Sequence, residues 1–216
     1  MGVTTPDINQ DSANAFKNSE SFKYLNTKRT VDLIATLLVL PVALLISAIT
    51  ALAIKIESPG AIFFWQKRVG MDGVVFNMLK FRSMTTDSEQ HGSQFAQSND
   101  RRVTHVGKFI RKFRIDEIPQ LWNVLKGEMS IIGPRPEQES FVKEFNKNIP
   151  NYSLRHMVKP GITGLAQTEQ GYVADAEATI TKLEYDLYYI KNMSLLTDAQ
   201  ITMKTIYTIL TGFGAR

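Results

Sequence analysis

Residues 33–54 contain no charged side chain, and this stretch of 22 residues constrains the fold more than any other feature of the chain. As a helix that rises about 1.5 Å per residue, it would be about 33 Å long, which matches the hydrocarbon thickness of a bilayer. The stretch is too long and too uniformly apolar for an ordinary buried core helix, and it lacks the small-residue cleavage site of a signal peptide. We therefore predict that it is inserted in a membrane.

Pro41 lies in the middle of this stretch and decides how the helix would sit in the membrane. A proline removes one backbone hydrogen bond and kinks a helix. Both flanks carry basic residues, and the positive-inside rule favours a cytoplasmic position for each. A helix that breaks at Pro41 and returns to the side it entered satisfies both flanks, whereas a kinked helix that spans the membrane satisfies one. Sequence physics alone leaves the two arrangements open. The flanking basic residues are Lys28, Arg29, Lys55, Lys67 and Arg68.

The composition narrows the classes of function. A net charge of +4 suits phosphate-bearing partners, whether nucleic acid, anionic lipid or nucleotide. The chain has no cysteine and only three histidines, which lack ligand-like spacing, so we expect no disulfide, no thiolate metal site and no zinc enzyme. We expect no nucleic-acid partner, because the aromatic residues lie in apolar contexts and are not interleaved with basic residues. The sequence also lacks a Walker loop and a Gly-x-Gly-x-x-Gly fingerprint.

The rest of the chain is expected to fold as one small domain. The polar residues 1–27 are expected to form a mobile leader, and residues 57–85 alternate short extended runs with turn signals. Residues 137–147 and 176–192 are typical of helices. Residues 195–213 are apolar on one face, which predicts a core helix or a helix in the membrane interface. This apolar tail also offers a surface for a homodimer.

Adjacent carboxylates, Asp116 and Glu117, follow residues 101–114, which carry six basic residues and no acid. The ordinary interpretation is a helix start, because Asp is a preferred N-cap and Glu favours the first turn. We expect this helix to contain Pro119 in its first turn and to end at Gly127. The nearby cations are expected to lower the pKa of Asp116 and keep it ionised, as a nucleophile or metal ligand requires. The free N–H groups of the helix start would add a phosphate site.

Basic residues elsewhere lie in contexts that fix their direction. Lys80 and Arg82 end an extended run, where alternation points both to one face. Arg135 lies between two prolines, and a rigid arginine fork suits phosphate recognition. We therefore predict an enzyme site in which basic residues bind a diphosphate, one carboxylate attacks, and the other holds a divalent ion, with Mg²⁺ as the suited cation. A membrane-bound scaffold with a basic face is the alternative. The predicted diphosphate-binding residues are Lys80, Arg82, Arg111 and Arg135.

A series of motifs runs in order along the chain. They are KRTVD at 28–32, GAIFFWQKRVG at 60–70, KFRSM at 80–84, GKFIRK at 107–112, DEIPQLWNVLKGEMS at 116–130, GPRP at 133–136, KPGITGLAQ at 159–167 and YDLYYI at 185–190. In this order they resemble the bacterial sugar transferase family, the monotopic phosphoglycosyl transferases that start the assembly of capsule, exopolysaccharide, O-antigen and glycoprotein glycans. The resemblance covers residues 28–210.

The resemblance implies an enzyme that moves a sugar phosphate from a nucleotide diphosphate sugar, usually a UDP-sugar, to a polyprenyl phosphate such as undecaprenyl phosphate. The reaction would pass through a covalent aspartyl-phosphosugar intermediate and release UMP. The resemblance implies that Asp116 is the nucleophile and that Glu117 binds Mg²⁺. It also matches Arg111, Arg135 and Asp186 to substrate-site positions of the family. It does not identify the sugar.

The resemblance also implies a re-entrant helix over residues 28–56, broken at Pro41, with both ends on the cytoplasmic face of the bacterial inner membrane. Many members have a serine before the proline, whereas Leu40 stands here, so Thr36 or Ser47 would have to support the break. The expected fold is α+β: a mostly helical catalytic domain over residues 57–216 with short strands. This domain would be anchored in membrane lipid by the re-entrant helix and by amphipathic interfacial helices, without the extra membrane helices of longer members.

Overall fold

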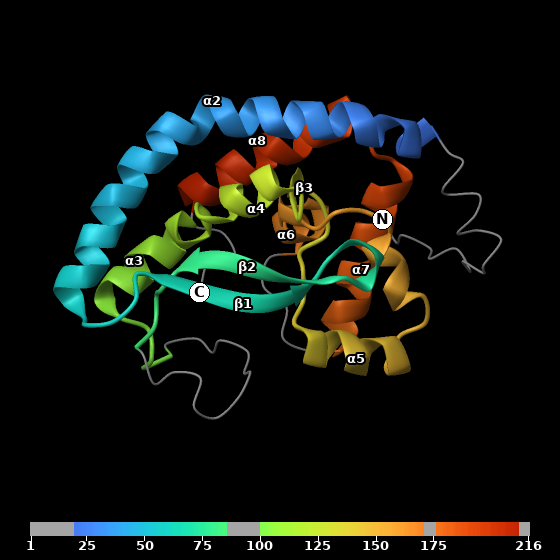
Figure 1. Cartoon of the computed structure of the whole chain (residues 1–216). Helices are drawn as coiled ribbons and strands as arrows, with labels where there is room; N and C mark the ends of the chain where they lie inside the picture. The colour runs from blue at the N-terminus through green and yellow to red at the C-terminus, as the bar shows by residue number, and fades with distance from the viewer. Residues whose placement is uncertain (1–19, 86–99, 171–175, 212–216) are drawn as a thin grey trace.

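The computed structural model describes residues 20–85, 100–170 and 176–211. These residues form a mostly helical domain with short strands, as the sequence predicts (Figure 1). One long helix, α2, arches over the other elements, and the two strands β1 and β2 lie beneath it. α2 therefore forms one apolar layer of the domain, and the strands lie on its inner side.

The apolar stretch forms most of α2 (Glu20–Glu57), a helix of 38 residues. It begins earlier than expected, within residues that the sequence assigned to a mobile leader, because Tyr24 and Leu25 pack against the core. Residues 1–19 of the expected leader lie outside the described residues. The helix is uninterrupted at Pro41, so the structure has an arched, continuous helix where the sequence predicted a break.

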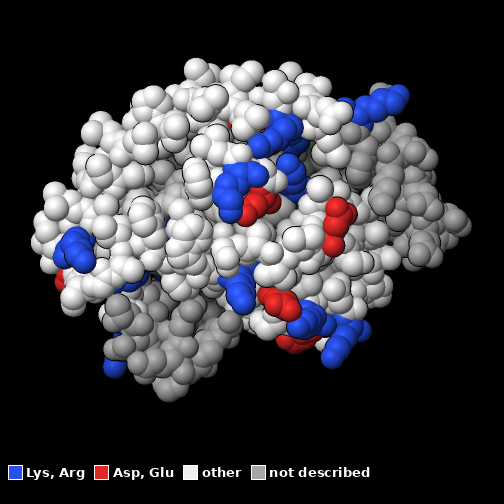
Figure 2. Space-filling view, in the orientation of Figure 1, with Lys and Arg blue, Asp and Glu red and all other residues white. Residues whose placement is uncertain are grey.

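One stripe of α2 faces the domain along the whole helix, and the opposite side is apolar and exposed. The buried positions are separated by four or seven residues, the period of a single helix face. On the exposed side, Leu38 is 75% exposed, and Figure 2 shows the upper edge of the arch without charged side chains between its ends. By length and composition, α2 is a helix that could cross a membrane. The buried positions are Lys28, Asp32, Thr36, Ala43, Thr50 and Ile54.

Thr36 does not support a break in the helix in the way the sequence analysis required. Its side-chain oxygen is buried and has no hydrogen-bond partner among the described residues. Thr36 lies on the buried stripe of a helix that is continuous at Pro41.

The strands predicted within residues 57–85 are confirmed, and the structure adds a second small sheet that was not predicted. β1 (Phe63–Val69) and β2 (Val75–Phe81) are antiparallel, and Phe64 lies opposite Lys80. β3 (Ser130–Ile132) and β4 (Gly161–Thr163) are parallel. The helices after α2 are α3 (His105–Lys112), η2 (Ile115–Glu117), α4 (Gln120–Lys126), α5 (Glu139–Asn148), η3 (Tyr152–Met157), α6 (Leu165–Glu169), α7 (Ala176–Lys191) and α8 (Leu195–Thr211).

The expected helix of the tail is α8, and its two faces differ. Ile201 and Thr208 are buried against the domain. Leu196, Tyr207 and Leu210 are exposed, and Leu210 has 77% of its surface open. A helix with a packed face and an exposed apolar face suits the interface of a membrane.

The two ends of α2 are attached to the same domain. Near its start, Lys28 Nζ lies 2.5 Å from Asp198 Oδ2 of α8, and both side chains are buried. Near its end, the Glu57 carboxylate accepts a hydrogen bond of 2.6 Å from the N–H of His105 at the start of α3. Ile54 packs in a core cluster with Phe81. The long helix is therefore fixed at both ends, and its middle arches between the two attachments.

The buried Lys28–Asp198 pair predicts a stability effect. Asp198→Asn would leave the Lys28 ammonium without its nearest carboxylate in a buried site, and it would weaken the hydrogen bonds that Tyr24 and Tyr189 donate to Asp198. We expect the free energy of unfolding to fall by about 3 kcal/mol, measured by thermal unfolding in detergent. Glu139→Gln, which removes an exposed pair with Lys143, is the control and should leave the melting temperature unchanged. Equal melting temperatures for Asp198→Asn and the wild type would contradict this role for the pair.

Candidate active site

The acid pair lies on a tight turn between α3 and α4. Arg114, which precedes the turn, has a φ of 57°, an uncommon backbone conformation for a residue other than glycine. The N–H groups of Glu117 and Ile118 bond to the carbonyl oxygens of Arg114 and Ile115 within the turn. The pair therefore occupies a 3-10 turn and not the predicted first turn of an α-helix.

α4 runs from Gln120 to Lys126, and Gly127 caps it with a φ of 83°, which allows the left-handed ending that the sequence predicts. It has only seven residues, and its first N–H groups follow the acid pair instead of surrounding it. The predicted phosphate site at a helix N-terminus is therefore wrong. The positive charges beside the acid pair come from side chains instead.

Glu117 is the centre of a buried ion cluster. Its Oε1 accepts hydrogen bonds from Lys80 Nζ of β2 at 3.3 Å and from Arg135 at 2.5 Å. Burial alone would raise the pKa of Glu117, but the charges of Arg135 and Lys80 outweigh burial and hold its pKa well below the ordinary range. The sequence analysis assigned all three residues to one site, and the structure brings them together.

Asp116 is also buried, but it has no hydrogen bond or ion pair with the described residues. Burial raises the pKa of Asp116 to about 6, the charge of Glu117 adds to this, and the charges of Lys80, Arg111 and Arg135 oppose it. The predicted lowering of this pKa is therefore wrong, because loss of water outweighs the cations. At pH 7 the carboxylate is still ionised in about nine molecules of ten. Asp116 is thus a charged, poorly solvated carboxylate without a partner among the described residues.

Lys80 has a perturbed pKa of its own. Burial lowers the pKa of Lys80 to about 8, and Arg135 and Arg68 contribute in the same direction, while Glu117 opposes them. The lysine is therefore the basic group in the cluster whose charge is lost at moderately alkaline pH. An anion bound beside it would restore the proton.

Asp186 lies behind Arg135 and acts on it through a residue that the sequence analysis missed. The Arg155 guanidinium donates two hydrogen bonds to Asp186, at 3.0 and 2.7 Å, and a third to the main-chain oxygen of Arg135 at 2.8 Å. Arg155 and Asp186 are each 2% exposed. Asp186 was expected in the substrate site, and its contacts in the structure are those of a residue that positions the backbone of Arg135.

A second ion cluster fixes the chain on the other side of Arg135. Arg68 of β1 donates to the main-chain oxygen of Pro136 at 3.0 Å and pairs with Glu137, which also pairs with Lys182 of α7. Burial raises the pKa of Glu137, but Lys182 and Arg68 outweigh it and hold the pKa at about 2. The direction of the Arg135 side chain is therefore set from both flanks.

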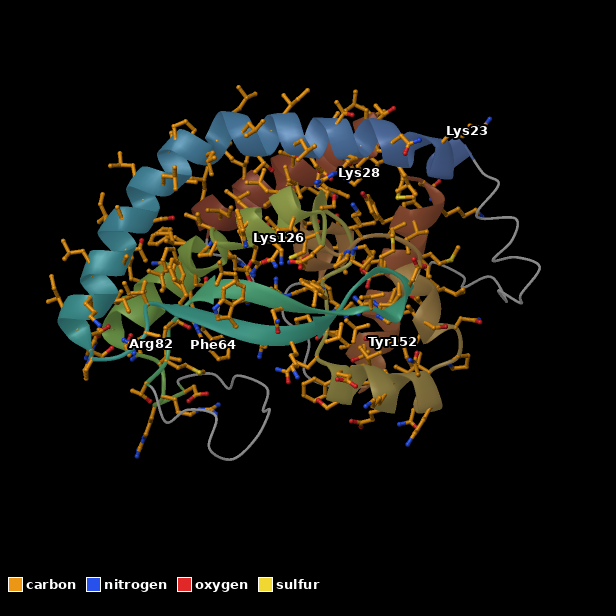
Figure 3. All side chains as sticks on the ribbon, in the orientation of Figure 1. Lys23, Lys28, Phe64, Arg82, Lys126 and Tyr152 are labelled. Carbon is orange, nitrogen blue, oxygen red and sulfur yellow. The ribbon has the colours of Figure 1, made fainter. Side chains whose placement is uncertain are left out.

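Arg82 binds the turn after α2, whereas Arg111 lies close enough to the acid pair to affect the pKa of Asp116. The Arg82 guanidinium donates to the main-chain oxygens of Pro59 at 2.7 Å and Ser58 at 2.9 Å. Figure 3 shows Arg82 near the end of α2, so its hydrogen bonds fix the turn after that helix and not the Glu117 cluster. Arg111 donates to Ser83 at 2.8 Å, and its charge lowers the pKa of Asp116. Arg111 therefore contributes to the electrostatics of the acid pair.

The site offers a limited set of ligands for a divalent ion. The described residues contain no group of three or more His, Asp or Glu side chains that could hold a metal. Asp116 has both oxygens without partners, and Glu117 uses Oε1 for Lys80 and Arg135. Two carboxylates completed by phosphate oxygens fit Mg²⁺, which is usually bound by one or two carboxylates together with substrate.

The raised pKa of Asp116 predicts that Asp116→Asn stabilises the fold in a pH-dependent way. Since the folded pKa is about 6 and the ordinary value is 3.8, ionisation destabilises the folded state fully above pH 6 and not at all below pH 3.8. We expect the variant to gain about 1–3 kcal/mol in the free energy of unfolding at pH 8. The gain should shrink as the pH falls from 6 toward 4. Chemical unfolding at several pH values measures it, and a gain that is constant with pH would contradict the burial of the charge.

Comparison with known proteins identifies the family of the chain. Residues 23–212 match the family model described as bacterial sugar transferase. The chain is 56% identical over 193 residues to a UDP-N-acetylgalactosamine-undecaprenyl-phosphate N-acetylgalactosaminephosphotransferase of Aeromonas hydrophila, with 89% of this chain and 46% of the relative covered. It is 43% identical over 182 residues to a UDP-glucose:undecaprenyl-phosphate glucose-1-phosphate transferase of Klebsiella pneumoniae, with 83% and 39% covered.

A shorter relative is covered more completely. A UDP-glucose:undecaprenyl-phosphate glucose-1-phosphate transferase of Caulobacter vibrioides is 39% identical over 186 residues, with 85% of this chain and 70% of the relative covered. The chain spans less than half the length of the Aeromonas and Klebsiella relatives. The family match nevertheless extends from α2 to the end of α8, so the acid pair, its cations and the arched helix all lie within it. The chain belongs to the bacterial sugar transferase family.

Proposed function

We propose that this chain transfers a sugar phosphate from a UDP-sugar to undecaprenyl phosphate and releases UMP. The proposal rests mainly on Asp116, a buried carboxylate that has no partner among the described residues. The adjacent Glu117 accepts hydrogen bonds from the cations of Lys80 and Arg135. Such a carboxylate is poised to react with an electrophile that the cations attract. The names of the relatives supply the substrate classes, a UDP-sugar and undecaprenyl phosphate. Glucose, galactose and N-acetylated sugars all fit the proposal.

In the first half of the reaction, an oxygen of Asp116 attacks the phosphorus that carries the sugar. The bond from that phosphorus to the UMP oxygen breaks, UMP leaves, and an aspartyl-phosphosugar remains on the enzyme. Lys80, Arg135 and Arg111 offset the negative charge of the diphosphate as the bond to UMP lengthens. Glu117 does not need to react, since its role is to hold Lys80 and Arg135 and to ligate Mg²⁺.

In the second half, a phosphate oxygen of the acceptor lipid attacks the same phosphorus. The bond to Asp116 breaks, the carboxylate is restored, and the product is a polyprenyl diphosphate sugar. One site thus serves two similar phosphates in turn, which is a ping-pong sequence. Mg²⁺ bound by Glu117 and Asp116 would supply further positive charge for the phosphates.

We also propose that α2 is a re-entrant anchor on the cytoplasmic face of the bacterial inner membrane. A helix that crossed the bilayer would separate its two ends by about 30 Å of hydrocarbon. Here Lys28 and Glu57 are both bound to the same domain. An arch that dips into one leaflet keeps both attachments and exposes its apolar outer side to lipid. This position brings the acid pair to the surface where the acceptor phosphate lies.

Covalent labelling tests the nucleophile. With UDP-sugar that carries ³²P in the sugar-linked phosphate and with no acceptor, the wild type should retain label, and Asp116→Asn should retain none because an amide oxygen is a poor nucleophile. Asp72→Asn is the matched control: Asp72 lies on an exposed turn with φ of 55°, a conformation that asparagine tolerates. The control should label like the wild type. Labelling of Asp116→Asn at the wild-type level would overturn the assignment.

The pH dependence of UMP release without acceptor tests the cluster. Asp116 must be ionised, so the rate at low UDP-sugar concentration should fall as the pH drops through about 6. Lys80 must be charged, so the rate should also fall as the pH rises through about 8. Omitting the acceptor removes the titration of its phosphate from the profile.

Lys80→Arg separates the two limbs of this profile. Arginine keeps its charge over the whole range, so the alkaline limb should vanish while the acid limb stays near pH 6. The variant should lose about tenfold in rate, because the guanidinium does not reproduce the geometry of the ammonium. An alkaline limb that persists unchanged in this variant would show that another group titrates.

A further inference from the structure

Two basic side chains from distant parts of the chain meet above Gly127. Arg29 comes from the first turns of α2, and Lys159 lies just before β4. A side-chain carbon placed on Gly127 would lie 3.5 Å from an Arg29 guanidinium nitrogen and 3.5 Å from Lys159 Nζ. The two cations are therefore no more than twice that distance apart, and the absent side chain of Gly127 leaves space between them.

Neither cation forms an ion pair with a carboxylate of the described residues. Arg29 donates to the carbonyl oxygens of Val124 at 2.6 Å and Leu125 at 3.1 Å, both of them neutral groups. Lys159 forms no hydrogen bond or ion pair with any residue that the structure describes. Burial lowers the pKa of Lys159, the charge of Arg29 lowers it further, and the charge of Asp32 opposes both.

The nearby acids are engaged elsewhere. Asp32 accepts hydrogen bonds from Ser130 at 2.7 Å and from the N–H of Ile131 at 3.3 Å. Glu128 pairs with Lys126 at 2.6 Å and accepts a hydrogen bond from the Asn123 side chain at 2.7 Å. An anion between Arg29 and Lys159 would therefore meet two cations that form no ion pair with the described carboxylates, while Asp32 keeps its hydrogen bonds to Ser130 and Ile131.

We propose that Arg29 and Lys159 bind the phosphate group of an anionic membrane lipid. Arg29 lies at the flank of the apolar part of α2, where basic side chains meet lipid headgroups. Figure 2 shows basic side chains gathered directly below the arch of α2, in the region where Figure 3 labels Lys126. A phosphate monoanion with two acyl chains would reach the pair from the same lipid leaflet that receives α2. The inference rests on the proposed membrane position of α2 and not on the chemistry of Asp116.

This lipid phosphate is distinct from the phosphate of the acceptor. The acceptor phosphate must reach Asp116, which precedes α4, whereas Gly127 follows α4. Gly127 lies ten positions after Glu117, and α4 takes up most of that stretch, so the two places are on the order of 10–15 Å apart. A lipid held at Arg29 and Lys159 therefore anchors the domain beside the reacting lipid without occupying its site.

Lipid binding by the purified full chain tests the proposal. The chain in a non-ionic detergent is titrated with phosphatidylglycerol, and bound lipid is counted by native mass spectrometry. We expect Lys159→Gln to weaken the tightest lipid site by about fivefold or more, because one cation beside the phosphate is lost. Lys159→Arg should retain binding. Lys147→Gln, which removes an exposed lysine on α5, is the matched control and should bind like the wild type.

Further arms identify the source of the phosphate and separate this proposal from the catalytic one. Inorganic phosphate and diacylglycerol, which each lack one part of the lipid, should not compete with phosphatidylglycerol at equal concentration. Asp116→Asn should bind lipid like the wild type. Equal lipid binding by Lys159→Gln and the wild type, with unchanged melting temperatures in lipid-free detergent, would overturn the site. Full competition by inorganic phosphate would overturn its assignment to a lipid.

Discussion

The buried contact of Glu117 with Lys80 and Arg135 is the interaction on which the rest of the site depends. A carboxylate that has lost its water is unfavourable unless cations replace that water, and Glu117 receives two. Because both cations are held by Glu117, the adjacent Asp116 stays buried and charged without a partner of its own. In the proposed reaction the same cluster binds the anionic substrate, and one carboxylate is left to react with it.

The three residues of the cluster, Lys80, Glu117 and Arg135, come from three separate segments of the chain. The fold holds these segments together. Arg155 and Asp186 fix the backbone of Arg135 from behind, and the Arg68–Glu137–Lys182 contacts fix the next residues. α2 contributes in the same way, since Lys28 and Glu57 attach its two ends to the domain. The proposed membrane anchor, α2, is therefore also attached to the domain that holds the site.

Local patterns made the long apolar helix, the strands within residues 57–85 and the meeting of Glu117 with Lys80 and Arg135 predictable from sequence. The length of the uncharged stretch, the alternation around Lys80 and the two prolines around Arg135 act within a few residues, so a single sequence reveals them. The pKa of Asp116 was not predictable, because it depends on burial by residues far along the chain. Arg155 was missed for the same reason: its partner Asp186 is 31 residues away, and no local motif marks it. Arg82 lies just after the end of β2, so the alternation of the strand does not set its direction. It binds the main-chain oxygens of Ser58 and Pro59 instead.

The identity of the residue that becomes attached to the sugar phosphate is the most direct test of the central claim. An aspartyl phosphate is reduced by borohydride to homoserine, and trypsin releases residues 115–126 as one peptide because Arg114 and Lys126 flank it. After incubation with UDP-sugar and reduction, tandem mass spectrometry should find homoserine at position 116 and an unmodified Glu117. Reduction at Glu117, or an unchanged peptide from an enzyme that has released a full equivalent of UMP, would contradict the account.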